Sequence, residues 1–213
     1  MAPKDGATGD RVNSFAGLRE AYLQSNPAFD GAMTVPVLWN KSAGRIVNNE
    51  SSEIIRMLNS ELNEFAEHPE LDFYPEPLRD KIDATNEWVY ASINNGVYRC
   101  GFATKQQAYG RAFNELFTSL DRAEVLLAEQ RYLTGERFTE ADIRLFVTLL
   151  RFDAVYVAHF KTNKKRIVDY PNLWAYTREI YQMPGIAETV NMRHIKGHYF
   201  ESHRHINPHG IVP

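Results

Sequence analysis

The spacing of apolar residues changes character near residue 66. Before that point, short apolar runs bounded by turn residues predict a strand at 34–39 and a returning strand at 45–47, joined by a turn at 41–44. Helical spacing precedes this hairpin at 18–24 and follows it from Ser51 to about residue 62. The first part of the chain is therefore predicted to combine strands and helices.

The rest of the chain has the spacing of helices. The segment 66–78 carries three prolines and four acidic residues, which predicts a linker. Beyond it, apolar residues recur at helical spacing in 82–93 and 113–127, with breaks expected at 94–96 and 100–101. Thr139 and Asp142 form a capping box, and the nearly all-apolar run 143–160 that follows predicts a buried central helix.

These patterns predict an α/β plus all-α fold. We expect an N-terminal domain over 1–65, the linker over 66–78 and an all-helical domain over 79–213. A length of 213 residues suits this two-part organisation.

Composition narrows the classes of partner. The net charge of −3 gives no reason to expect a nucleic acid or an anionic membrane as partner, and no apolar run reaches transmembrane length. The short basic run 161–166 is interpreted as solvated surface charge. Because Cys100 is the only cysteine, a disulfide framework within the chain is impossible, and we expect a cytoplasmic protein.

Two features of the first part suggest a ligand site. A cis peptide bond between Val35 and Pro36 would expose the backbone of Val35 to an extended ligand, although a trans proline at a sheet edge is commoner. Glu50 and Ser51 open a helix, whose free N–H groups favour a carboxylate, although plain capping by Asn49 or Ser51 is the commoner use. Together the two features indicate a site for a short peptide with a free carboxylate.

Several motifs resemble one known family. The stretches that carry the resemblance are TVPVLWN, IVNNESSEIIRML, NNGVYRCGFAT, RYLTGERFTEADIRLFVTLLRFDAVYVAHFK, YPNLWAYTREIYQMPGIAETVN and HIKGHYFESHRHINPHGI. In this order they resemble the glutathione transferases, and more narrowly the Xi class, the glutathionyl-hydroquinone reductases. The resemblance implies a partial thioredoxin-like N-terminal domain and an all-helical glutathione-transferase C-terminal domain.

The resemblance also implies roles for individual residues. Val35, before the cis-proline Pro36, would bind the cysteinyl part of glutathione through its backbone, and Glu50 and Ser51 would hold the γ-glutamyl carboxylate.

Three tyrosines receive roles in the same way. Tyr98 would donate a proton to the leaving aromatic, and Tyr156 and Tyr199 would stabilise a thiolate. Without the surrounding motifs, all three would pass for ordinary half-buried tyrosines. Glutathione is the implied co-substrate, aromatic quinol conjugates are the implied substrates, a homodimer is the implied assembly, and no metal is implied.

The family's nucleophile has no counterpart in this chain. The family uses a cysteine in a Cys-Pro-Trp-Ala motif, which the sequence lacks, and the seventeen mostly polar residues before Leu18 are too few for a first βαβ unit. Cys100 is interpreted as a small buried residue rather than a replacement. His194 and His198 have the i, i+4 spacing of metal ligands, but the tail that holds them matches the family's signature.

Two hypotheses follow. The first is a glutathione-dependent reductase that releases hydroquinone from glutathionyl-hydroquinones, present here as an N-terminally truncated form of doubtful activity when alone. The second is a non-catalytic module that binds glutathione or a quinol, or that serves in dimerisation.

Overall fold

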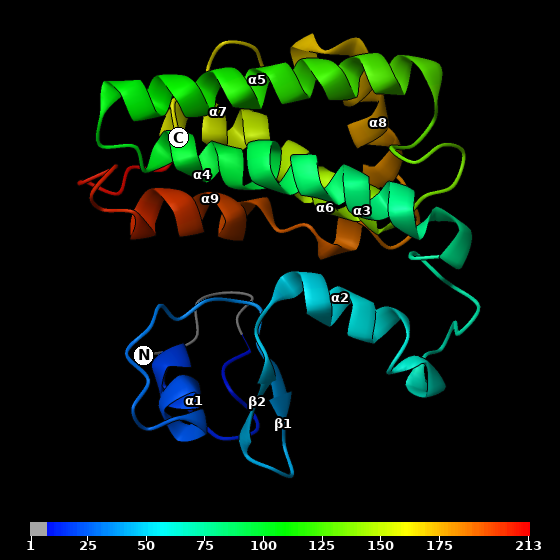
Figure 1. Ribbon diagram of the computed structural model, residues 1–213. Helices are drawn as coiled ribbons and strands as arrows, with labels where there is room; N and C mark the ends of the chain where they lie inside the picture. Colours follow the sequence, from blue (N-terminus) through cyan, green and yellow to red (C-terminus); the bar gives the residue numbers. More distant parts are fainter. Residues whose placement is uncertain (1–7) are drawn as a thin grey trace. The chain divides into compact units, whose positions relative to one another are not determined.

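The computed structural model describes residues 8–213 and divides into two compact units, Met1–Asp72 and Phe73–Pro213. We call these the N-terminal and C-terminal units and describe each by itself (Figure 1). The boundary between them lies inside the segment 66–78, for which the sequence predicts a linker.

The N-terminal unit combines one hairpin with short helices. Its elements are α1 (Leu18–Ser25), β1 (Leu38–Asn40), β2 (Arg45–Asn48), α2 (Ser51–Asn59) and a 3-10 turn (Asn63–Phe65). The two strands pair antiparallel, with Trp39 opposite Ile46 and Asn40 opposite Arg45. Gly44 closes the turn at φ 61°, a backbone conformation that favours glycine, and donates its N–H to Asn40 at 2.9 Å.

Two predictions for this unit are corrected in their bounds. The strand expected over 34–39 begins only at Leu38, since Pro36 has no N–H to donate to a ladder. The helix expected to reach residue 62 ends at Asn59, and Ser60 follows it as the C-cap. The mixture of strands and helices in this part of the chain is confirmed.

The C-terminal unit is helical throughout its described residues. Its α-helices are α3 (Arg79–Trp88), α4 (Asn95–Gly101), α5 (Gln106–Glu129), α6 (Glu140–Arg151), α7 (Val157–His159), α8 (Pro171–Tyr181) and α9 (Met192–Ser202). Two wider π-helical segments, Val89–Asn94 and Phe152–Tyr156, join α3 to α4 and α6 to α7. Short 3-10 turns lie at Glu76–Leu78, Ile167–Asp169 and Ala187–Thr189.

The central helix prediction is confirmed. The capping box at Thr139 and Asp142 is present, and α6 begins directly after it. Leu145, Leu149 and Phe152 are almost completely buried, so this run forms the middle of the core. The Asp142 carboxylate also accepts the N–H of Leu133 at 2.8 Å, which ties the preceding loop to the helix start.

The break expected at 94–96 is wrong. The helix continues through Asn94, because its amide does not turn the backbone but donates to the Arg144 carbonyl at 2.8 Å and the Thr148 hydroxyl at 2.6 Å. Gly96 is buried, and a Cβ there would lie 3.7 Å from Leu116. The expected break at 100–101 is confirmed, since α4 ends at Gly101.

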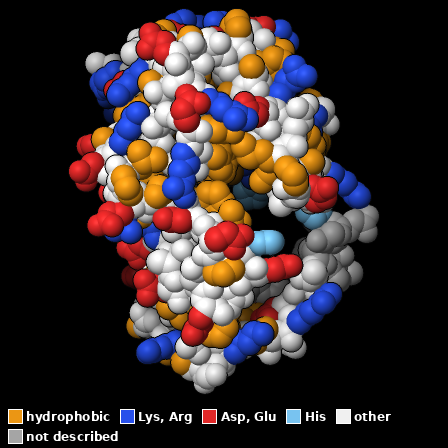
Figure 2. Space-filling view, turned by 90° about the vertical axis from the view of Figure 1, so that its right-hand side faces the viewer, with side chains coloured by type: hydrophobic (Ala, Val, Ile, Leu, Met, Phe, Trp, Pro, Cys, Tyr) orange, Lys and Arg blue, Asp and Glu red, His pale blue; other side chains and the backbone are white. Residues whose placement is uncertain are grey.

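Acidic and basic side chains are interspersed on the molecular face seen in Figure 2. Among residues 8–213, no helix has both the length and the apolar character needed to cross a membrane.

Candidate functional site

The first group of predicted site residues lies in the N-terminal unit. The peptide bond between Val35 and Pro36 is cis, and the Val35 side chain is 75% exposed. Glu50 is the N-cap of α2, and its carboxylate accepts the N–H of Ser52 at 3.3 Å. The cap is therefore Glu50, rather than Asn49 or Ser51, the two residues considered for plain capping.

Ser51 is left available by this arrangement. Because Glu50 satisfies the N–H and the hydroxyl of Ser52, the first helical residue keeps its own donors. Within the part of the chain that the structure describes, the N–H and hydroxyl of Ser51 donate to no protein group. A free N–H at a helix start favours a carboxylate ligand.

A hydrogen-bonded network joins the two predicted segments. The Asn49 amide donates to the hydroxyls of Tyr22 and Thr34, both at 3.1 Å, and the Tyr22 hydroxyl donates to the Thr34 carbonyl at 2.9 Å. Thr34 directly precedes Val35, and Asn49 directly precedes Glu50. The network therefore brings the cis-proline segment beside the start of α2.

Sequence reasoning missed the buried centre of this network. Tyr22 lies on α1 and is only 5% exposed. Its hydrogen-bond partners Thr34 and Asn49 lie 12 and 27 residues away in the sequence, so a local sequence pattern could not predict these bonds. Asn49 was considered only as a cap, although an Asn side chain can also donate two hydrogen bonds.

The second group of predicted residues lies in the C-terminal unit and meets at one point. The Tyr199 hydroxyl lies 2.6 Å from that of Tyr98 and 2.8 Å from that of Tyr156. Tyr98 comes from α4, Tyr156 from the end of the π-helical segment Phe152–Tyr156, and Tyr199 from α9. We call these three residues the tyrosine row.

Either hydroxyl of each pair can be the donor, and burial indicates the direction of the row. Three hydroxyls share three protons, and the two hydrogen bonds between them use two. Tyr156 and Tyr199 are buried, whereas Tyr98 is half-buried. If Tyr156 donates to Tyr199 and Tyr199 donates to Tyr98, the proton left over is that of Tyr98, at the accessible end of the row.

Burial keeps the inner hydroxyls protonated. The pKa values of Tyr156 and Tyr199 are raised well above the ordinary value, first by burial and then by the neighbouring tyrosines. Both hydroxyls are therefore hydrogen-bond donors at every physiological pH.

Aromatic rings surround the row and fix its geometry. The Phe160 ring stacks on Tyr156 at 5.4 Å and contacts Tyr98 at 5.4 Å and Tyr199 at 5.8 Å between ring centroids. Gly101 allows this packing, because a Cβ there would lie only 2.0 Å from the Phe160 ring. A side chain at position 101 would displace the ring that the tyrosines share.

A buried histidine, His159, and a half-buried one, His203, lie beside the same rings. His159 Nε2 and His203 Nδ1 are 3.1 Å apart, and His203 stacks on Phe160. Burial is the main cause that lowers the pKa of His159 to about 4, and the neighbouring His203 lowers it further. Burial also lowers the pKa of His203, so the pair is neutral at pH 7.

Cys100 has the character expected of a structural residue. Its side chain is 3% exposed, and burial raises the pKa of the thiol to about 11. A thiol with this pKa is almost entirely protonated at neutral pH and is a poor nucleophile.

Metal ligands are not grouped in the described residues. Among residues 8–213, no three His, Cys, Asp or Glu side chains are arranged to hold a metal ion. This includes the region of His194 and His198, whose spacing alone resembled that of metal ligands.

Comparison with known proteins identifies the family. The family described as "Glutathione S-transferase, C-terminal domain" matches residues 106–179. The glutathionyl-hydroquinone reductase YqjG of Escherichia coli strain K12 is 54% identical over 207 residues, which are 97% of this chain and 63% of that protein. The glutathionyl-hydroquinone reductase PcpF of Sphingobium chlorophenolicum is 49% identical over 99% of this chain and 67% of that protein.

Solved structures agree with the sequence relatives. The glutathione-bound structure of YqjG has a TM-score of 0.94 at 53% identity, covering 99% of this chain and 68% of that one. The crystal structure of glutathione-S-transferase Xi from Phanerochaete chrysosporium has a TM-score of 0.96 at 53% identity. The match covers 100% of this chain and 72% of that one. The chain thus spans about two thirds of the length of these relatives, and it belongs to the glutathionyl-hydroquinone reductase family, the Xi class of the glutathione transferases.

Proposed function

We propose that the protein acts in the glutathione-dependent reduction of glutathionyl-hydroquinones to free hydroquinones. The observation that carries this proposal is the tyrosine row, in which Tyr98 keeps its own proton when the two buried hydroxyls donate along the row. Two relatives that are 54% and 49% identical bear the name of this activity, which supports the assignment.

The N-terminal unit is proposed as a partial thioredoxin-like domain that binds glutathione. In this proposal the Val35 backbone, next to Pro36, pairs with the cysteinyl part. The start of α2 at Glu50 and Ser51 holds the γ-glutamyl part, with the Ser51 N–H and hydroxyl as donors to its carboxylate. The hydrogen bond between Asn49 and Thr34 supports it, since it makes the two segments neighbours. The glutathione-bound structure of YqjG supports it as well.

The proposed reaction balances as an exchange at sulfur. A thiolate attacks the glutathione sulfur of the conjugate and forms a mixed disulfide with it. The bond from that sulfur to the aromatic carbon breaks. The carbon takes the bonding electron pair and a proton from Tyr98, which gives the hydroquinone. A second glutathione then releases the first as glutathione disulfide and restores the thiolate.

The chain does not itself supply an obvious nucleophile. Its only cysteine, Cys100, is buried with a pKa of about 11, and no Cys-Pro-Trp-Ala motif occurs in the 213 residues. The residues of this chain are therefore proposed to bind glutathione and to provide the proton. The same observation favours the second candidate, a non-catalytic module that binds glutathione or a quinol.

One experiment separates the two candidates. The purified chain is incubated with a glutathionyl-hydroquinone and glutathione, free hydroquinone is measured by chromatography, and binding is measured on immobilised glutathione. Hydroquinone release above the rate without protein, lost in Tyr98→Phe, supports the reductase. Glutathione binding without release shows that these residues do not turn over the conjugate by themselves, which favours the module. If the chain neither binds glutathione nor releases hydroquinone, both proposals are wrong for these residues.

We also propose a homodimer located in the cytoplasm, with aromatic quinol conjugates as the substrate class. A single cysteine, which is buried and reduced, supports a reducing compartment. Sedimentation velocity of the purified chain tests the assembly, since a dimer has twice the mass of the 24.5 kDa chain.

A further inference from the structure

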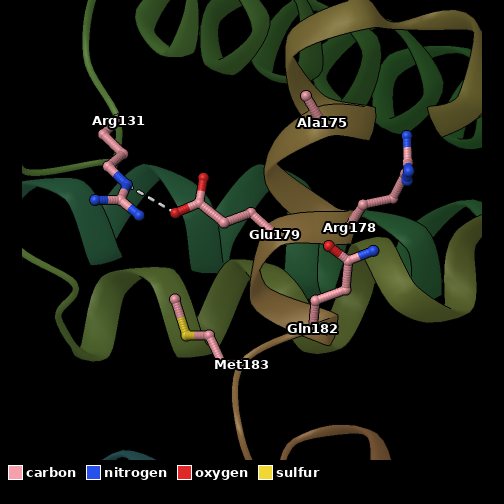
Figure 3. A pocket seen from close by; sticks show the side chains of 6 residues that line it. All are labelled: Arg131, Ala175, Arg178, Glu179, Gln182 and Met183. Carbon is pink, nitrogen blue, oxygen red and sulfur yellow. Dashed lines mark hydrogen bonds and ion pairs between the residues drawn. The ribbon is translucent and has the colours of Figure 1, made fainter.

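A hollow of about 400 Å³ lies in the C-terminal unit beside α8 (Figure 3). Its lining consists of Arg131, Ala175, Arg178, Glu179, Gln182 and Met183. None of these residues belongs to the tyrosine row, which lies on α4, the segment Phe152–Tyr156 and α9. Its volume falls within the range of small-molecule sites.

Glu179 is held in place from one side of the hollow. Its Oε1 atom accepts the Nε–H of Arg131 and the hydroxyl of Tyr132, both at 2.7 Å. Tyr132 is buried, and burial together with Glu179 raises its pKa to about 12, so it stays a donor. The ion pair in Figure 3 is therefore fixed before any ligand arrives.

The pinned arginine keeps most of its donors. Arg131 donates its Nε–H to Glu179, and its guanidinium lies 5.2 Å from the centroid of the Tyr132 ring. Its terminal nitrogens donate to no group among the described residues. A guanidinium held in this way loses little side-chain entropy on binding and presents a planar fork that suits a carboxylate or a phosphate.

Arg178 is the second cation in the lining of the hollow. Arg178 rests over the Trp174 ring at 5.9 Å, and its guanidinium forms no hydrogen bond within residues 8–213. In the view of Figure 3, Glu179 lies between Arg131 and Arg178. The lining carries two positive charges and one negative charge, while Ala175 and Met183 add apolar surface.

We propose that this hollow binds a small organic dianion whose two oxyanion groups, carboxylate or phosphate, reach Arg131 and Arg178. Two guanidiniums in one lining favour an ion with two charged groups over a single monovalent one. The Glu179 charge selects against anions that cannot engage both arginines, because a single contact would not offset its repulsion.

The test is an NMR titration of the full ¹⁵N-labelled chain with sodium succinate, and separately with inorganic phosphate, against sodium chloride at equal ionic strength. We expect saturable shifts confined to Arg131 and residues 175–183, at the C-terminal end of α8. A response to succinate that exceeds the response to inorganic phosphate supports a site for two oxyanion groups, since phosphate has only one. An equal response to phosphate would overturn the proposal that both arginines are engaged. Shifts spread over surface lysines and arginines, or none beyond those with chloride, would overturn the proposal.

A matched pair of variants gives a second test. Arg178→Gln should raise the dissociation constant about tenfold or more, because a charged hydrogen-bonding partner is lost. Arg111→Gln, an exposed change of the same kind on α5, should leave it unchanged. Equal affinity in the two variants would show that the hollow is not the binding site.

Discussion

The hydroxyl oxygens of Tyr156 and Tyr199 lie 2.8 Å apart, and both side chains are buried. A buried hydroxyl without a partner is costly, so each of these tyrosines requires the other. Tyr98 extends the contact toward the accessible side at 2.6 Å from Tyr199. Tyr199 is therefore the link on which the direction of the row depends.

Replacing this link should lower stability measurably. Tyr199→Phe removes both hydrogen bonds and leaves the Tyr156 hydroxyl buried without a partner. We expect a loss of about 1–3 kcal/mol in the free energy of unfolding, measured by urea denaturation. Tyr90→Phe is the control, because Tyr90 is 60% exposed and should change stability by less than about 0.5 kcal/mol. Equal losses in the two variants would argue against the row as a structural unit.

Local signals predicted those parts of the fold that depend on neighbours in sequence. Thr139 and Asp142 are three residues apart, so the start of α6 could be predicted from their spacing alone. Asn94 could not be predicted correctly, because its partners Arg144 and Thr148 lie 50 and 54 residues away. A turn-forming residue was held in a helix by contacts that no local pattern contains.

The site follows the same rule. Tyr98 and Tyr199 are separated by 101 residues, and only the family resemblance singled them out among eleven tyrosines. Tyr22 carries no motif and was missed, although it organises the segment before Val35. Sequence reasoning thus identified the residues proposed to touch a ligand but not a residue that positions their segments.

The start of α2 gives a prediction about glutathione binding. Ser51→Ala removes a hydroxyl that no protein group uses, so the folded protein should keep its stability. We expect the dissociation constant for glutathione, measured by calorimetry, to rise about two- to tenfold through the loss of one hydrogen bond. Ser60→Ala at the opposite end of α2 is the matched control, because its hydroxyl bonds the Arg56 carbonyl. The proposed contact is wrong if glutathione binds both variants equally.

The histidine pair predicts how stability depends on pH. The pKa of His159 falls from 6.5 to about 4 on folding, so between these values the unfolded chain binds more protons than the folded protein. The stabilising contribution is therefore complete above about pH 6.5 and is lost as the pH falls toward 4.

Substitution of His159 should reduce this dependence. Between pH 7.5 and 5, His159→Gln should lose less free energy of unfolding than the unchanged protein, by up to about 2 kcal/mol. His68→Gln is the control, since the His68 side chain is 65% exposed. Urea denaturation at both pH values measures the difference. Identical pH dependence in His159→Gln and the unchanged protein would mean that His159 titrates normally in the fold.

Two glycines should respond to the same substitution with opposite signs. A Cβ at Gly101 would lie 2.0 Å from the Phe160 ring, so Gly101→Ala should destabilise the fold by about 1–3 kcal/mol through overpacking. Gly110 lies inside α5 with nothing within 4 Å of an added Cβ, so Gly110→Ala should stabilise by about 0.5–1 kcal/mol through helix propensity. Thermal and urea denaturation of both variants measure the signs. If Gly101→Ala is neutral, Phe160 can move away at little cost, and it does not fix the tyrosine row.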